Sequence, residues 1–99
     1  MNPLSARPTP RPLTVGRLFA THGALEAVRA ANASVGDLLT RHLHGDWGDL
    51  RAEDRRQNDV ALENGLRVLS CYELPGNGKV WIITEWNRSV TTVLLPDDY

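Results

Sequence analysis

The clearest pattern in the chain is the alternation of polar and apolar residues over its last third. Three β-rich runs, Arg67–Leu74, Lys79–Trp86 and Ser89–Leu95, are separated by short turn sequences. Asn77-Gly78, between the first two runs, is the strongest short-range hairpin signal in the chain. We therefore predict a three-stranded antiparallel β-meander.

Side-chain alternation also assigns the two faces of this meander, if Asn77-Gly78 and Asn87-Arg88 are both two-residue turns. One face then carries Leu69, Cys71, Val80, Ile82, Thr84, Trp86, Thr91, Val93 and Leu95. The other face carries Val68, Ser70, Tyr72, Trp81, Ile83, Glu85, Val90, Thr92 and Leu94. Both faces have apolar members, so we expect both to be partly covered. The polar members gather toward the second turn, and we expect any site at that end.

The first half of the chain has the spacing of amphipathic helices. Thr21 is a candidate N-cap for a helix over about 22–31, with Asn32 as its stop. Ser34 begins a capping box for a second helix that runs to about His44. Narrow apolar stripes on both helices predict that each packs one side against the meander.

A third helix and a further strand complete the predicted elements. Asp49 is a candidate N-cap for a highly charged surface helix that ends at Asn64-Gly65. A short strand is predicted within Leu13–Ala20, and residues 1–12 form a flexible arm rich in proline and arginine. The predicted fold is α+β: an N-terminal short strand and two or three helices packed on a C-terminal three-stranded antiparallel β-meander, with residues 13–99 as a single domain.

Composition and charge narrow the class of protein. With 99 residues, of which 41% are hydrophobic and 23% charged, the chain fits one ordinary globular domain. Eleven basic and twelve acidic residues leave a net charge of -1, so no global field attracts nucleic acid or an anionic membrane. No membrane span or signal sequence is evident, and the single cysteine is typical of a reducing compartment, so we expect a cytoplasmic protein.

His42 is the most informative single residue, because it falls at the centre of the apolar stripe of the second helix. One interpretation is a core histidine whose nitrogens are paired with buried partners. The other is a general base or acid in a cleft above the sheet, with its pKa tuned by a carboxylate such as Glu85.

Metal, nucleotide and thiol chemistry are not predicted. His42 and His44 lie two positions apart on a helix and do not share a face, so we expect no metal site. No phosphate-binding glycine loop is present, and we expect no cofactor. Cys71 has no neighbouring base in the sequence and is expected to be a core thiol.

A cluster of hydrogen-bonding residues lies at the second turn. Glu85, Arg88 and Thr92 would suit a phosphate group or an RNA backbone. The alternative is a turn arginine beside threonines that favour strands.

Aromatic residues are the candidates for a protein contact. The chain has three tryptophans, and one beside a turn can anchor a partner. The predicted binding residues are Trp47, Tyr72, Trp86 and Arg88.

Several motifs together resemble a known group of proteins. They are His42–Asp54 (HLHGDWGDLRAED), Asn58, Leu69-Ser70, Tyr72, Trp81–Glu85 (WIITE), Arg88-Ser89, Thr91-Thr92 and the tail from Leu94 to Tyr99. Over about residues 15–99 the chain resembles small proteins of bacterial plasmids and integrative elements, sometimes labelled type I restriction "M" subunits. The sequence does not support that label, because a methyltransferase needs a much longer cofactor-binding domain with its glycine-rich loop. The resemblance to proteins of mobile elements implies a role in host interference or anti-defence, or a toxin-like role.

Two functional hypotheses follow. The first is a small interaction module, borne by a mobile element, that binds a host or defence-system protein without catalysis; a homodimer through a sheet edge is a further expectation. The second is a small metal-independent ribonuclease of the toxin type, in which His42, Glu85, Arg88 and Thr92 act on RNA.

Overall fold

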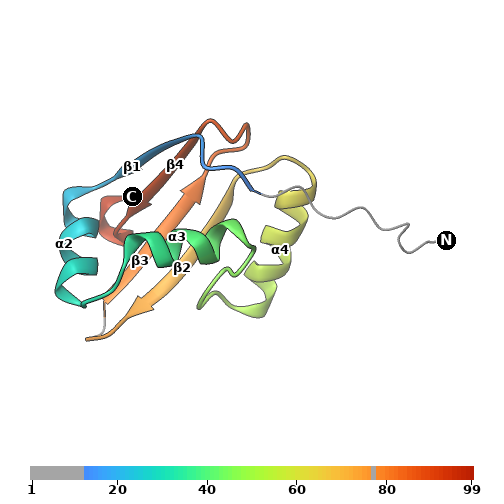
Figure 1. The fold of residues 1–99 in the computed structure, drawn as a ribbon. Helices are drawn as coiled ribbons and strands as arrows, with labels where there is room; N and C mark the ends of the chain where they lie inside the picture. The colour runs from blue at the N-terminus through green and yellow to red at the C-terminus, as the bar shows by residue number, and fades with distance from the viewer. Residues whose placement is uncertain (1–12, 77) are drawn as a thin grey trace.

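The last third of the chain forms the three antiparallel strands that the alternation predicts. In a computed structural model, which describes residues 13–76 and 78–99, these are β2 (Val68–Leu74), β3 (Gly78–Thr84) and β4 (Val90–Leu94) (Figure 1). The predicted arm, residues 1–12, lies outside the described residues.

A fourth strand changes the predicted architecture. β1 (Arg17–Ala20) pairs in parallel with β4, so the sheet has four strands in the order β1-β4-β3-β2 and is mixed. The α+β class is confirmed. The prediction of a three-stranded antiparallel sheet with the short strand outside it is wrong, because β1 belongs to the same sheet. β4 lies far from β1 along the chain. No pattern in the sequence around β1 indicates that the two strands pair.

The three predicted helices are present. Thr21 Oγ1 accepts from the Ala24 amide at 3.1 Å to cap α2 (His22–Ala30), and Ser34 Oγ accepts from the Asp37 amide at 3.2 Å to cap α3 (Val35–Leu43). α4 (Ala52–Glu63) begins after Arg51, which makes no side-chain cap. The prediction of an Asp49 cap is therefore wrong.

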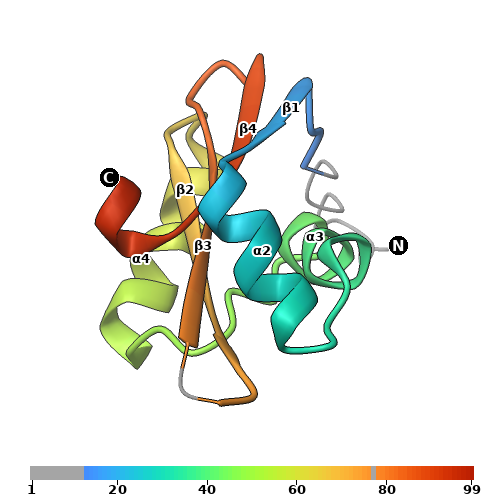
Figure 2. The ribbon, with the colours of Figure 1, turned by 90° about the vertical axis from the view of Figure 1, so that its left-hand side faces the viewer.

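The sheet separates two layers of unequal size. Figure 2 shows α2 and α3 on one side of the sheet, and α4 with the C-terminal turn η1 (Pro96–Asp98) on the other. We call the side under α2 and α3 the covered face; it consists of Val68, Ser70, Tyr72, Leu74, Val80, Ile82, Thr84, Thr91 and Val93. We call the opposite side the open face; its members include Leu69, Cys71, Glu73, Lys79, Trp81, Ile83, Thr92 and Leu94.

The predicted faces are correct for β3 and β4 but wrong for β2. Thr84 pairs with Thr91, the register that a two-residue Asn87-Arg88 turn gives. Leu74 pairs with Gly78, so three positions instead of two separate the paired ends of β2 and β3. Because side chains alternate with a period of two, that one-residue difference moves every β2 side chain to the opposite face.

The hydrophobic core lies on the covered face. Its main cluster joins Val28 of α2 and Leu38 of α3 to Tyr72, Ile82 and Val93 of the sheet. A smaller cluster links Leu13, Trp47, Ala61 and Val68 near the end of α4.

Within residues 13–76 and 78–99, no helix has both the length and the apolar character needed to cross a membrane.

Candidate functional site

His42 lies inside the core, between α3 and the covered face. Its side chain is fully buried, and its two nitrogens contact hydroxyls of two different strands. Nδ1 lies 2.5 Å from Ser70 Oγ and Nε2 lies 2.8 Å from Thr84 Oγ1. The Trp47 ring meets the imidazole edge-on at 5.7 Å between ring centroids. No open cleft reaches the imidazole.

The hydroxyl hydrogens define the direction of this network. Thr91 Oγ1 donates to the carbonyl oxygen of Val15 at 2.8 Å, so it accepts from Thr84 Oγ1, also at 2.8 Å. Thr84 has then used its one hydrogen and accepts from His42 Nε2–H, which leaves Nδ1 to accept from Ser70. Every member is satisfied only when the imidazole is neutral.

The surroundings of His42 disfavour its charged form. Burial, followed by the positive charge of Arg88, lowers the pKa of His42 from 6.5 to about 4. A second proton on Nδ1 would also turn Ser70 from a donor into an acceptor and take away the acceptor of the Ser70 hydroxyl hydrogen. These features are those of a structural histidine, the first of the two interpretations of this residue.

The other residues of the predicted catalytic set do not gather around His42. The carboxylate of Glu85 accepts from Arg67 at 3.2 Å at the surface. The Arg88 guanidinium donates to the carbonyl oxygens of Leu66, Glu85 and Ala61, at 2.6, 3.1 and 3.3 Å, and so ties the second turn to the end of α4. Thr92 lies on the open face, across the sheet from His42.

Two of the predicted binding residues are buried. Trp47 donates from Nε1 to Asp59, in the C-terminal half of α4, at 2.9 Å. The Tyr72 hydroxyl donates to the Asp46 carbonyl at 2.6 Å, and burial raises its pKa to about 12. Of the predicted aromatic anchors only Trp86 reaches the surface, where it is 63% exposed.

The outer edge of β2 is closed by its own chain. The Asn58 side chain of α4 acts as a short strand: it accepts from the Leu69 amide at 3.1 Å and donates to the Leu69 carbonyl at 2.5 Å. The Asp49 amide donates to the Cys71 carbonyl at 2.7 Å, and the Asp49 carboxylate accepts from the Glu73 amide at 2.8 Å. The outward backbone groups of Leu69 and Cys71 and the Glu73 amide are therefore not free to pair with another strand.

Gly48 makes that close approach possible. Its φ is +76°, and a Cβ added there would lie 2.1 Å from the Cys71 carbonyl oxygen. Only a residue without a side chain allows the segment before α4 to lie directly against β2.

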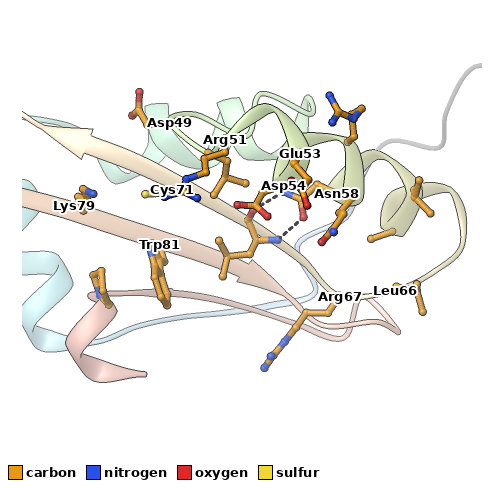
Figure 3. Close-up of a pocket in the computed structure, with 17 residues that line it drawn as sticks. Asp49, Arg51, Glu53, Asp54, Asn58, Leu66, Arg67, Cys71, Lys79 and Trp81 are labelled. Carbon is orange, nitrogen blue, oxygen red and sulfur yellow. Dashed lines mark hydrogen bonds between the residues drawn. The ribbon is translucent and has the colours of Figure 1, made fainter.

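The open face carries a concave surface. A groove of about 1010 Å³ runs between α4 and η1 (Figure 3). Leu69, Cys71 and Trp81 of the open face form its floor, and Pro96 of η1 also lines it. Tyr99 packs edge-on against Trp81 at 5.8 Å, and its hydroxyl accepts from Arg67 at 2.7 Å.

Charges of both signs surround this apolar floor. Glu53 and Asp54 lie along α4, whereas Arg51 and Lys79 lie at one end of the groove and Arg67 at the other. Burial raises the pKa of the Cys71 thiol, so the sulfur in the floor is a protonated, weakly nucleophilic group. The groove is therefore suited to contact by apolar side chains.

Sequence reasoning missed this groove because of the β2 register. The predicted faces separated Trp81 from Leu69 and Cys71, which the observed register brings onto one surface. Pro75-Gly76 before the predicted turn was the signal for a longer connection.

Neither the metal-ligating residue types nor comparisons with known proteins assign a function to these surfaces. No cluster of three or more histidine, cysteine, aspartate or glutamate residues that would suit a metal occurs in the ranges that the structure describes. Comparisons of the chain with protein-family models, curated proteins and solved structures found no match.

Proposed function

We propose that this protein is a non-catalytic interaction module whose partner is another protein. The observation that carries the proposal is the open-face groove, floored by Leu69, Cys71 and Trp81 and left uncovered by α2 and α3. Sites that bind a ligand or a partner are usually concave and lined mainly by apolar side chains, with a few polar groups around them. The occupant we propose is a polypeptide segment that inserts an aromatic or leucine side chain over Trp81.

The charges around the groove favour a protein over a nucleic acid. A phosphate backbone meeting Lys79 and Arg51 would also meet the carboxylates of Asp49, Glu53 and Asp54. A polypeptide with both acidic and basic side chains can match both signs.

The wider setting of the module follows from the sequence. The resemblance to proteins of mobile elements stays a prediction, and on it we propose a host or defence-system protein as the partner. Cys71, the chain's single cysteine, is a free thiol, so we propose the reducing cytoplasm as its compartment.

The ribonuclease alternative gains no support from the geometry. It requires His42, Glu85, Arg88 and Thr92 around one substrate, but His42 is sealed and Arg88 is occupied by three carbonyl oxygens. A general base must reach its proton directly or through one water, and the buried imidazole has no such path.

Capture of partners from a bacterial lysate tests the proposal when two tryptophans are compared. Trp81→Ala removes the groove floor, whereas Trp86→Ala removes an exposed tryptophan that does not line the groove. We expect the same captured protein with the wild-type chain and with Trp86→Ala, and at least a tenfold loss (about 1.4 kcal/mol) with Trp81→Ala.

Thermal unfolding of each variant is the control for folding, so that a loss of binding is not mistaken for a loss of structure. Equal capture by all three proteins, or a loss with Trp86→Ala alone, would contradict the groove as the binding site. Capture of nothing by the wild-type chain would count against the function itself.

A further inference from the structure

The two edge strands of the sheet, β2 and β1, differ in whether their outward backbone groups have hydrogen-bond partners. Asn58 and Asp49 occupy the outward backbone groups of β2. β1 forms the opposite edge, and its only strand partner among the described residues is β4. Within residues 13–76 and 78–99, one edge is thus closed and the other is open.

Backbone alternation identifies the free groups on β1. The amides of Arg17 and Thr21 donate to Ser89 and Val93, so odd-numbered residues bond inward to β4. The N–H and C=O groups of Leu18 and Ala20 therefore point away from the sheet. Leu18 and Phe19 are 47% and 48% exposed, an apolar pair on a free strand edge.

We propose that β1 pairs with β1 of a second copy of this chain, antiparallel, about a twofold axis that passes beside Phe19. In that register Leu18 faces Ala20 of the second copy, and the two residues exchange both backbone hydrogen bonds; the symmetric pair adds two more. Phe19 then lies opposite its own symmetry mate, an aromatic cross-strand pair.

The local structure selects this register over its neighbours. Gly16, with φ +64°, ends the extended segment before β1, and α2 starts at His22. Pairing Leu18 with its own symmetry mate, or Ala20 with its own, would give half as many hydrogen bonds within the strand. The register that pairs Leu18 with Ala20 uses every outward group of β1.

Charge complementarity points to a second copy as the occupant. In the proposed register Arg17 faces Thr21 of the second copy, on the same side of the sheet as Phe19. Thr21 Oγ1 donates to Asp98 at 2.7 Å, so the carboxylate of Asp98 lies where that arginine would reach. The twofold axis repeats the pair of opposite charges at both ends of the interface.

Analytical ultracentrifugation of the full chain tests the dimer. Because one short strand pair buries less than a standard interface, we expect a dissociation constant on the order of 10–100 µM. Phe19→Asp sets two like charges face to face and should weaken the dimer at least about tenfold. Val60→Asp, at a 55% exposed position on α4, is the matched control and should leave the dimer unchanged.

A second variant reports the register directly. Phe19→Cys sets two thiols opposite each other in a non-hydrogen-bonded pair, where the short Cα separation suits a disulfide. Under oxidation we expect a covalent dimer, and none from Val60→Cys. A wild-type chain that stays monomeric to about 1 mM would overturn the proposal. A dimer that Phe19→Asp does not weaken would also overturn it. These outcomes are independent of partner capture at the groove.

Discussion

The two faces of the sheet differ in the polar groups that they bury and in the apolar groups that they leave accessible. The covered face contains the polar set of Ser70, Thr84 and Thr91 with His42, all sealed from solvent. The open face has an apolar floor around Trp81, in contact with the groove. The buried imidazole and hydroxyl groups add hydrogen bonds to an apolar core, whereas the apolar floor of the groove is the surface that we propose for recognition. A histidine among hydroxyls is thus not a catalytic site when every hydrogen has an internal partner.

The largest effect should follow from removing the buried imidazole. His42→Ala leaves a cavity and strands the hydroxyls of Ser70 and Thr84, so we expect a loss of about 3–5 kcal/mol in the free energy of unfolding. Urea denaturation measures it. His44→Ala, at an exposed histidine of the same segment, should cost less than about 0.5 kcal/mol. Similar losses for the two variants would show that the covered face is not sealed around His42.

The same histidine should make the fold sensitive to acid. Its pKa is about 4 in the folded protein and 6.5 in the unfolded chain, so the unfolded chain binds the extra proton between those values. The contribution of His42 to the free energy of unfolding should be constant above pH 6.5. It should decrease by up to about 3 kcal/mol as the pH falls toward 4. Denaturation at a series of pH values measures the slope, and His42→Gln should reduce it. An unchanged slope in that variant would assign the acid sensitivity to other groups.

The sequence predicted the location of this polar cluster but not its role. Helical spacing placed His42 on the inner side of its helix, and alternation placed threonines near the second turn; both were right. The buried network depends on the Trp47 ring against the imidazole and on the Val15 carbonyl oxygen that accepts from Thr91. No local pattern in the sequence connects these two residues to His42. The groove was not predicted because the predicted register of β2 was wrong by one residue. The closed edge was not predicted because it depends on the close approach of Gly48 to β2. Long-range packing, rather than weak propensity, set these limits.

A smaller effect should follow from reopening the β2 edge. Asn58→Ala removes both partners of the Leu69 backbone, and we expect a loss of about 2 kcal/mol in the free energy of unfolding. Hydrogen exchange at the Leu69 amide should speed up in the same variant. Gln57→Ala, the exposed neighbour on α4, should change neither quantity appreciably. If Asn58→Ala behaved like Gln57→Ala, the side chain would not be closing the edge.

The smallest effect is expected on the open face. Tyr99→Ala removes an aromatic contact with Trp81 and should cost about 0.5–1.5 kcal/mol. Acrylamide should then quench Trp81 fluorescence more strongly, because the ring loses its cover. Tyr99→Phe keeps the ring but not the hydrogen bond from Arg67, and should leave the quenching unchanged. Quenching that rose equally in both variants would contradict packing by the ring.

The central claim, that the open-face groove accepts an apolar group, is tested most directly through the three tryptophan indole N–H signals. We would titrate the nitrogen-15-labelled protein with the apolar probe 1-anilinonaphthalene-8-sulfonate and follow those signals by NMR. The Trp81 signal should shift in a saturable manner, while the signals of buried Trp47 and of exposed Trp86 stay in place. An unmoved Trp81 signal, or a shift at Trp86 alone, would contradict the groove as a binding surface.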